Sequence, residues 1–155
     1  RELFSQNPQV ESYLVVQKEA AEKYMAKEGG NTMLAILFYP WFEIGIVHNF
    51  LRTDFKPTPR VESGLIRIEK RAKPLIDDSL ATLYRDYVVY RFTRDKSATS
   101  LSPHEWLTRF AAFVRGDDRK LHNKMVGSFG EWQREERMLS KIHRTRADED
   151  WKKFH

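Results

Sequence analysis

The feature that most constrains the fold is an apolar segment, residues 33–51, with the sequence MLAILFYPWFEIGIVHNFL. As a helix it would be about 28 Å long at roughly 1.5 Å per residue, close to the thickness of a bilayer core. Three features argue against a simple lipid-facing span. Glu43 is costly in hydrocarbon, Pro40 removes a backbone hydrogen bond, and Tyr39 and Trp41 lie centrally rather than at an interface. Three interpretations stay open: a buried helix kinked at Pro40, a membrane-embedded or interfacial segment, or two short elements meeting at Tyr39–Pro40.

Before this segment, the local signals predict a helix over residues 8–28. Asn7 is a favourable N-cap residue and Pro8 suits the first helical position. Apolar residues then recur at intervals of three and four. Gly29 and Gly30 are expected to end the helix, because glycine readily adopts the left-handed conformation.

After the apolar segment, a basic, proline-containing connector leads into a second helical pattern. Thr58–Pro59 repeats the cap-then-proline signal, and the spacing of apolar residues predicts a helix over 59–92 with a kink or a new start at Pro74. The run YVVYRF at 87–92 favours a strand by composition. We interpret it as helix because the preceding period is near 3.6 and no partner strand is evident nearby.

The sharpest local signal is a capping box at Ser102. Glu105 follows three residues later and Pro103 occupies the first helical position, which together predict a helix over 103–115 ending at Gly116.

A last helix is expected over 118–146, opened by Asp117 or Asp118. Gly127 and Gly130 inside it indicate either a close backbone approach or a break.

These signals together predict an all-α fold of several helices jointed by prolines. Residues 1–155 are expected to form a single helical domain, with 145–155 as a charged tail. Whether the helices form a compact bundle or an extended arrangement stays open at this level. The segment 33–51 is the part expected to be membrane-embedded or interfacial.

Charge is distributed unevenly along the chain, whose net charge is +5. Residues 1–51 hold four basic and six acidic side chains, whereas residues 52–155 hold 23 and 16. The basic part favours nucleic acid, an anionic membrane surface or an acidic partner. The absence of cysteine excludes disulfides, thiolate catalysis and cysteine-type zinc sites.

No pattern in the sequence predicts chemistry. There is no HExxH, no GxxxxGK[ST] and no GxGxxG, and the five histidines include no pair spaced by four residues. We therefore expect no catalytic residue, no cofactor, no metal site and no enzyme activity. Bases and aromatics interleave around Phe129 and Trp132, but Glu131, Glu135 and Glu136 dilute this basic stripe.

The function predicted from these features is that of a non-catalytic structural or accessory subunit. Its setting would be a large membrane-associated assembly, for which a mitochondrial inner-membrane complex of the respiratory-chain or ATP synthase type is the first hypothesis. The alternatives are an RNA-contacting accessory protein such as a ribosomal component, and a helical recruiting domain. Expected partners are other protein subunits and membrane lipid, with nucleic acid as the weaker alternative. The expected membrane or partner contacts are Leu37, Phe38, Trp41, Phe42, Glu43, Ile46, Phe50, Trp132 and Trp151.

Overall fold

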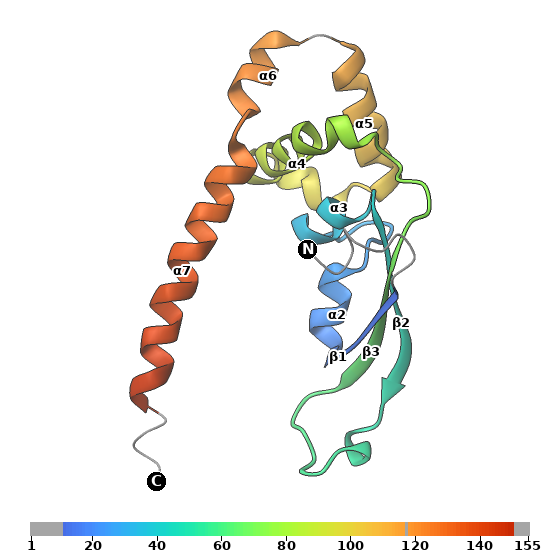
Figure 1. Cartoon of the computed structure of the whole chain (residues 1–155), viewed down its shortest axis with the longest axis vertical. Helices are drawn as coiled ribbons and strands as arrows, with labels where there is room; N and C mark the ends of the chain where they lie inside the picture. The colour runs from blue at the N-terminus through green and yellow to red at the C-terminus, as the bar shows by residue number, and fades with distance from the viewer. Residues whose placement is uncertain (1–10, 117, 151–155) are drawn as a thin grey trace.

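The computed structural model describes residues 11–116 and 118–150, with side chains described as far as residue 139. A three-stranded antiparallel sheet occupies one part of the molecule and a group of helices the other (Figure 1). The strands are β1 (Glu11–Gln17), β2 (Phe42–Phe50) and β3 (Ser63–Lys70). The α-helices are α2 (Lys18–Tyr24), α3 (Met33–Phe38), α4 (Ala81–Arg94), α5 (Pro103–Arg115), α6 (Arg119–Met125) and α7 (Ser128–Asp150). Short 3-10 turns are η1 (Arg52–Asp54), η2 (Asp78–Leu80) and η3 (Lys96–Ser100).

The sheet has the strand order β1-β3-β2. Ile66 is paired with Ile46 on one side and with Leu14 on the other. In β3, Ile66 and Ile68 alternate with charged residues, as side chains of a strand point alternately to its two faces. The register of β2 shifts between Ile46 and His48, where a bulge bends the strand.

Helix α2 covers one face of the sheet, and its Ala21 is fully buried there. Strand β1 lies at the edge of the sheet, next to β3 alone among the described strands. Three consecutive apolar side chains on it, Tyr13, Leu14 and Val15, are about half exposed. An edge of this kind carries unpaired backbone groups beside apolar side chains, which makes it prone to pairing with another strand.

The hydrophobic core lies among the helices, with α4 at its centre. Tyr84 of α4 packs edge-on against Trp41 and Phe110, and its hydroxyl donates a hydrogen bond of 3.1 Å to the carbonyl of Ile36. This bond joins α4 to α3, so the segment just before β2 is fixed to the helical part. Trp106 of α5 lies parallel to the ring of Phe92, 5.0 Å away.

Asn31 fastens the loop after α2 to the loop before α5. It is buried, its amide accepts a hydrogen bond from the Lys27 N–H, and it donates to the carbonyls of Lys27 and Leu101. The Asn31 N–H also donates to the Thr99 carbonyl at 2.8 Å. Because buried polar groups of this kind are costly to leave unpaired, the two loops hold one relative position. Gly29 and Gly30 precede Asn31 with positive φ angles of 80° and 66°.

The prediction of an all-α fold is wrong, because three of the expected helical segments contain strands. Residues 11–17 within the expected helix 8–28, and 63–70 within 59–92, are strands paired with each other. These strands form only by pairing with residues that are distant in the sequence. Capping residues, prolines and glycines report on local structure and do not reveal that pairing.

The segment 33–51 is also not one helix. It consists of α3, a turn at residues 39–41 and β2, so the chain breaks at Tyr39–Pro40, as in the third interpretation. Among the described residues, no helix combines the length and apolar character needed to cross a membrane.

Other local predictions are confirmed. Helix α5 begins with the capping box at Ser102 and ends at Gly116. Asp118 caps α6, and the expected last helix is broken near Gly127, whose φ is +88°. The residues of the expected first cap, Asn7 and Pro8, lie outside the described part of the chain.

Candidate nucleic-acid interface

The connection between β2 and β3 gathers aromatic and basic side chains at one end of the molecule. We call residues 48–62, together with Lys18, the hairpin end; it lies at the opposite end of the long axis from α6 (Figure 1). The segment includes the last residues of β2, the η1 turn and the connector that leads into β3.

Hydrogen bonds within the connector fix its shape. Arg52 donates from Nε to the Pro59 carbonyl at 2.8 Å, which closes the loop across seven residues. The Leu51 N–H donates to the Asp54 carboxylate at 2.8 Å, and the Asp54 N–H returns a bond of 3.0 Å to the Leu51 carbonyl. The connector is therefore an ordered platform for the side chains that it carries.

Three rings form a chain along this platform. His48 and Phe50 point to the same face of β2 because they are two residues apart, and their ring centroids are 4.7 Å apart. Phe55 packs against Phe50 at 5.3 Å in an edge-to-face arrangement. His48 is exposed, whereas Phe50 and Phe55 are half-buried. Aromatic rings are thus accessible from solvent but anchored to one another.

Three basic residues belong to the same connector, and Arg52 and Lys56 stand on either side of Phe55 in the sequence. Arg52, Lys56 and Arg60 are all exposed. Two of the nearby acids accept hydrogen bonds: Asp54 from the Leu51 N–H, and Glu62 from Lys18 Nζ at 3.0 Å. Glu19 and Glu22 of α2 also lie close to Lys18 and Arg60.

Lys18 stands where β1 ends and α2 begins, next to the connector. Its backbone N–H bonds the Glu62 carbonyl at 3.0 Å, so this pairing continues the β1–β3 ladder. The hydrogen bond to the Glu62 carboxylate, together with its charge, raises the pKa of the Lys18 ammonium above its ordinary value. Lys18 is therefore charged throughout the physiological pH range. A surface hollow of about 410 Å³ lies between this strand end and Arg60.

This combination has a defined chemical use. Exposed rings offer faces on which unpaired nucleobases stack, and such stacking contributes about 1–3 kcal/mol per base. Arginine and lysine beside the rings contact phosphate, and they displace the counterions of the nucleic acid. The hairpin end thus carries the two side-chain types that single-stranded nucleic acid needs.

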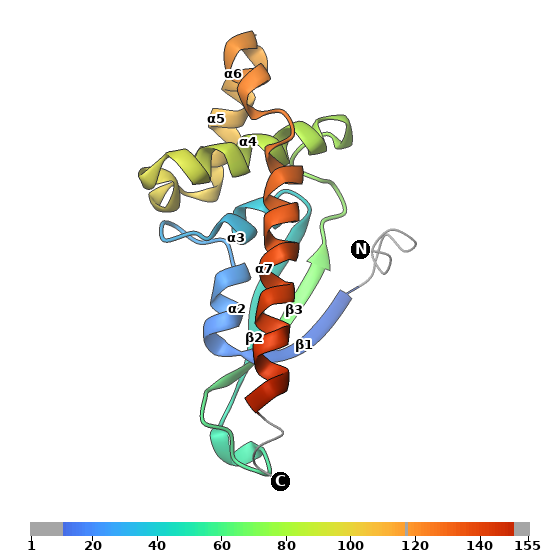
Figure 2. The same ribbon diagram turned by 90° about the vertical axis from the view of Figure 1, so that its left-hand side faces the viewer.

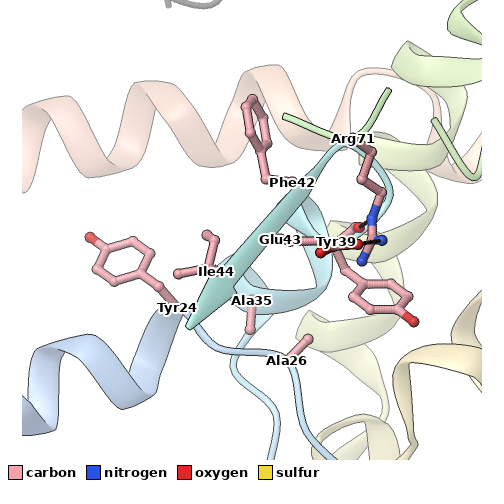
Figure 3. Close-up of a pocket in the computed structure, with 8 residues that line it drawn as sticks. All are labelled: Tyr24, Ala26, Ala35, Tyr39, Phe42, Glu43, Ile44 and Arg71. Carbon is pink, nitrogen blue, oxygen red and sulfur yellow. Dashed lines mark hydrogen bonds and ion pairs between the residues drawn. The ribbon is translucent and has the colours of Figure 1, made fainter. Parts of the chain in front are cut away.

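A second hollow, of about 140 Å³, lies between the loop after α2, α3 and β2 (Figure 3). Arg71 donates to the Tyr39 carbonyl at 3.1 Å, bonds the Glu43 carboxylate and lies 5.1 Å from the Tyr39 ring centroid. In Figure 3, the rings of Tyr24 and Phe42 point away from this group. Arg71 therefore fixes the end of β3 against the turn before β2, and Glu43 is paired within the chain itself.

The residues expected to make membrane or partner contacts do not form one surface. Leu37 and Trp41 are buried in the core, and Trp132 and Phe42 pack against it. Phe38 is exposed beside Tyr24, while Ile46 is half-buried in β2. Among them, Phe50 alone belongs to the hairpin end. Trp151 lies outside the described residues.

His48, Phe55, Arg52, Lys56 and Arg60 belong to this candidate interface but were not among the contact residues expected from the sequence. The connector RTDFKPTPR was recognised as basic and proline-rich. Its phenylalanine between two bases was the available signal, and only the bulged end of β2 brings His48 and Phe50 next to it. Within the described part of the chain, no three metal-binding side chains gather into one group.

Comparison with known proteins places these features in a family. The family model described as "Ribosomal RNA adenine dimethylase" matches residues 1–129, which include the whole sheet, the hairpin end and helices α2 to α6.

Curated relatives match about half of the chain. The mycinamicin-resistance protein MyrB of Micromonospora griseorubida is 41% identical over 75 residues, 48% of this chain and 24% of that protein. An rRNA adenine N-6-methyltransferase of Saccharopolyspora erythraea is 34% identical over 80 residues, 52% of this chain and 21% of that protein. The ribosomal RNA small subunit methyltransferase A of Bacillus mycoides is 33% identical over 85 residues, 52% of this chain and 28% of that protein. The matched part thus spans about a quarter of each relative.

A solved structure has a similar fold. The crystal structure of the 23S rRNA methyltransferase ErmE superimposes with a TM-score of 0.58 and 24% identity, covering 65% of this chain and 53% of that one. At this level of identity the likeness concerns the fold.

Proposed function

The chain belongs to the ribosomal RNA adenine dimethylase family, and from this premise we propose that it takes part in methyl transfer to the N-6 amino group of adenine in ribosomal RNA. The match to the family over residues 1–129 is the observation that carries the proposal. The role that we assign to the described residues is to hold the RNA, with the hairpin end as the contact surface.

Membership of this family corrects the function predicted from sequence. A non-catalytic accessory subunit of a membrane-associated complex is wrong, because the family is one of RNA-modifying enzymes. The expectation of no enzyme activity and the placement in the mitochondrial inner membrane are overturned by the same match, and no described helix is suited to span a membrane. Of the partner classes considered, RNA now has support, whereas membrane lipid and subunits of such a complex have none.

The chemistry of the proposed reaction explains why the hairpin end suits it. The N-6 amino group of a paired adenine lies inside a duplex, so an enzyme must act on an unpaired base or extrude it from the stack. The amino nitrogen then attacks a methyl group of a sulfonium donor. The methyl–sulfur bond breaks, the rest of the donor leaves as a thioether, and the nitrogen loses one proton. A base that has left its stack needs a new aromatic neighbour, and Phe50 and Phe55 provide accessible ring surface.

The surrounding bases supply the sequence-independent part of the binding. Arg52, Lys56 and Arg60 can each contact a phosphate, and the Glu62 carboxylate is paired with Lys18. Because each phosphate contact releases counterions, affinity at this surface is expected to fall steeply with salt.

The experiment compares RNA binding by the protein and by two hairpin-end variants, using fluorescence anisotropy with a labelled ribosomal RNA fragment. Phe55→Ala should weaken binding roughly tenfold to hundredfold, since one lost stacking contact is worth about 1–3 kcal/mol. The triple variant Arg52→Gln, Lys56→Gln, Arg60→Gln should also lower the slope of log affinity against log salt by about 2. Phe38→Ala, which removes an exposed ring outside the hairpin end, is the matched control. Equal weakening by the control, or no change in either variant, would reject the hairpin end as the contact surface.

A further inference from the structure

His48 lies at one end of the row of three rings in the hairpin end. Its ring centroid is 4.7 Å from that of Phe50, and the two ring planes are inclined at 80°. Phe55 approaches Phe50 at 5.3 Å with an inclination of 63°. Phe50 and Phe55 are half-buried, whereas His48 is exposed. Phe50 is thus the middle ring, and His48 is the more accessible of the two outer rings.

The backbone holds His48 in a defined position. The register of β2 shifts between Ile46 and His48, and His48 is then paired with Leu65 of β3. Because the ring of His48 is nearly perpendicular to that of Phe50, their contact covers at most one of the two faces of the imidazole. A face therefore remains for a further contact, and a ring fixed by the sheet loses little conformational freedom when it binds a ligand.

The surroundings of His48 give access to an extended ligand. In both views of the molecule, the connector between β2 and β3 extends beyond β1 and α2 and forms the tip (Figures 1 and 2). Arg52 and Lys56 of this connector are exposed. A strand of RNA that crosses the tip therefore reaches the outer rings from solvent, with positive charge available for its phosphates.

The proposed reaction creates a need for a second ring. When an adenine is extruded from its stack, the base next to it loses a stacking partner as well. Unpaired bases that are splayed out stack on aromatic side chains, and histidine is one of the side chains used in this way. Consecutive bases of one strand are joined by a single sugar-phosphate unit, so they stay close together. Two outer rings that share one middle ring fit two such neighbouring bases.

We propose that His48 is a second stacking position, which holds the base next to the target adenine while Phe55 holds the target itself. This inference rests on the proposed function and names its substrate class: an adenine whose neighbour in the strand is also unpaired. His48 contacts the substrate through the face of its ring and takes no part in the bond changes of methyl transfer.

The test measures binding of two labelled RNA hairpins by fluorescence anisotropy. One hairpin has a single unpaired adenine between paired segments, and the other has an unpaired adenine followed by a second unpaired nucleotide. His48→Ala should weaken binding of the two-nucleotide RNA about tenfold, the order expected for one lost stacking contact, and should leave binding of the single-adenine RNA unchanged. Phe55→Ala should weaken binding of both.

Two further variants identify the contact as stacking. His48→Phe keeps a flat ring and removes the imidazole nitrogens, so it should bind both RNAs as the unmodified protein does. Asn49→Ala is the matched control, because Asn49 is exposed and is the next residue of the same strand, where side chains point to the opposite face. It should also bind both RNAs normally.

The outcomes separate this inference from the proposed function. If the unmodified protein binds neither RNA, or if Phe55→Ala binds both as tightly as the unmodified protein, the proposed contact surface fails and this inference fails with it. If His48→Ala weakens both RNAs equally, His48 only supports Phe50, and this inference alone is overturned. Unchanged binding by His48→Ala, or a loss in His48→Phe as large as that in His48→Ala, overturns it too.

Discussion

The Asp86 carboxylate, on α4, accepts a hydrogen bond of 2.9 Å from the backbone N–H of Phe129, at the start of α7. Its other oxygen accepts the Gly127 N–H at 3.0 Å, and Asp86 is only 5% exposed. The first N–H groups of a helix have no partner inside the helix, and negative charge is favourable there. A side chain of α4 therefore determines where α7 begins and in which direction it leaves the core.

Replacing this carboxylate should loosen α7. Asp86→Ala leaves two backbone N–H groups without their partner, and we expect it to lower the free energy of unfolding by roughly 2–4 kcal/mol. Asp86→Asn keeps one accepting oxygen and should cost about half as much. Urea denaturation measures both changes. An alanine variant that unfolds at the same urea concentration as the unmodified protein would show that the contact does not hold α7.

Tyr84 predicts a loss of stability at alkaline pH. Burial, together with the neighbouring tyrosines, raises the pKa of Tyr84 well above the ordinary tyrosine value of about 10. The neutral phenol thus stabilises the fold fully below pH 10, and this contribution is lost as the pH rises above 10, because the unfolded chain then releases a proton that the folded chain retains. Unfolding midpoints measured from pH 8 to pH 11 should fall, and Tyr84→Phe should reduce that fall.

The control for this prediction is Tyr24→Phe, at an exposed ring. It should leave the alkaline loss of stability as in the unmodified protein. Near neutral pH, Tyr84→Phe is expected to cost about 1 kcal/mol for the lost bond to Ile36. If the two variants and the unmodified protein lose stability in parallel above pH 10, Tyr84 is not the group responsible.

The capping box at Ser102 predicts an effect of both mutation and acid. The Glu105 N–H donates to the Ser102 hydroxyl at 3.2 Å, and the Ser102 N–H donates to the Glu105 carboxylate at 2.8 Å. Ser102→Ala should lower the free energy of unfolding by about 0.5–2 kcal/mol. The hydrogen bonds from Ser102 lower the pKa of Glu105, so the stabilisation is present above the ordinary glutamate pKa of about 4.3 and lost as the pH falls through the lowered value. Thermal unfolding of Ser102→Ala and Glu105→Gln at pH 7 and pH 3 tests this; a wild-type midpoint for Ser102→Ala at pH 7 would contradict it.

Local sequence signals predicted the helical part well. The capping box, Gly116 and Asp118 each act within a few residues of where they occur, so no distant contact was needed to interpret them. The same holds for YVVYRF, which is part of α4 although its composition favours a strand.

The sheet could not be found in the same way. Leu65 and Ile68 fit a helical spacing, yet β3 forms because Leu65 pairs with Val15, fifty residues earlier in the sequence. Half-exposed apolar residues on β1 further obscured the alternation that identifies a strand. Because the sheet was not predicted, residues 33–51 were not recognised as a helix followed by a strand. The apolar run was therefore interpreted as a membrane or interface segment.

The interface depends on those same long-range contacts. His48, Phe50 and Phe55 form a row only because β2 ends with a bulge and the connector folds back through Arg52 and Pro59. The sequence shows that aromatic and basic residues are present, but it does not show that they lie next to one another in the fold. A surface formed by a loop between two strands is therefore hard to identify from helix-capping signals and composition alone.

The most direct test of the account is analysis of nucleosides from ribosomal RNA after incubation with the purified protein and a methyl-labelled sulfonium donor. Ribosomal RNA of the small and of the large subunit is offered, because one relative is a small-subunit methyltransferase and the name of another, an rRNA adenine N-6-methyltransferase, specifies no subunit. The account predicts labelled N-6-methylated adenosine in one of them, with Phe55→Ala lowering its yield at least tenfold and Phe38→Ala leaving it unchanged. A folded protein that binds RNA through the hairpin end yet yields no N-6-methylated adenosine from either RNA would contradict it.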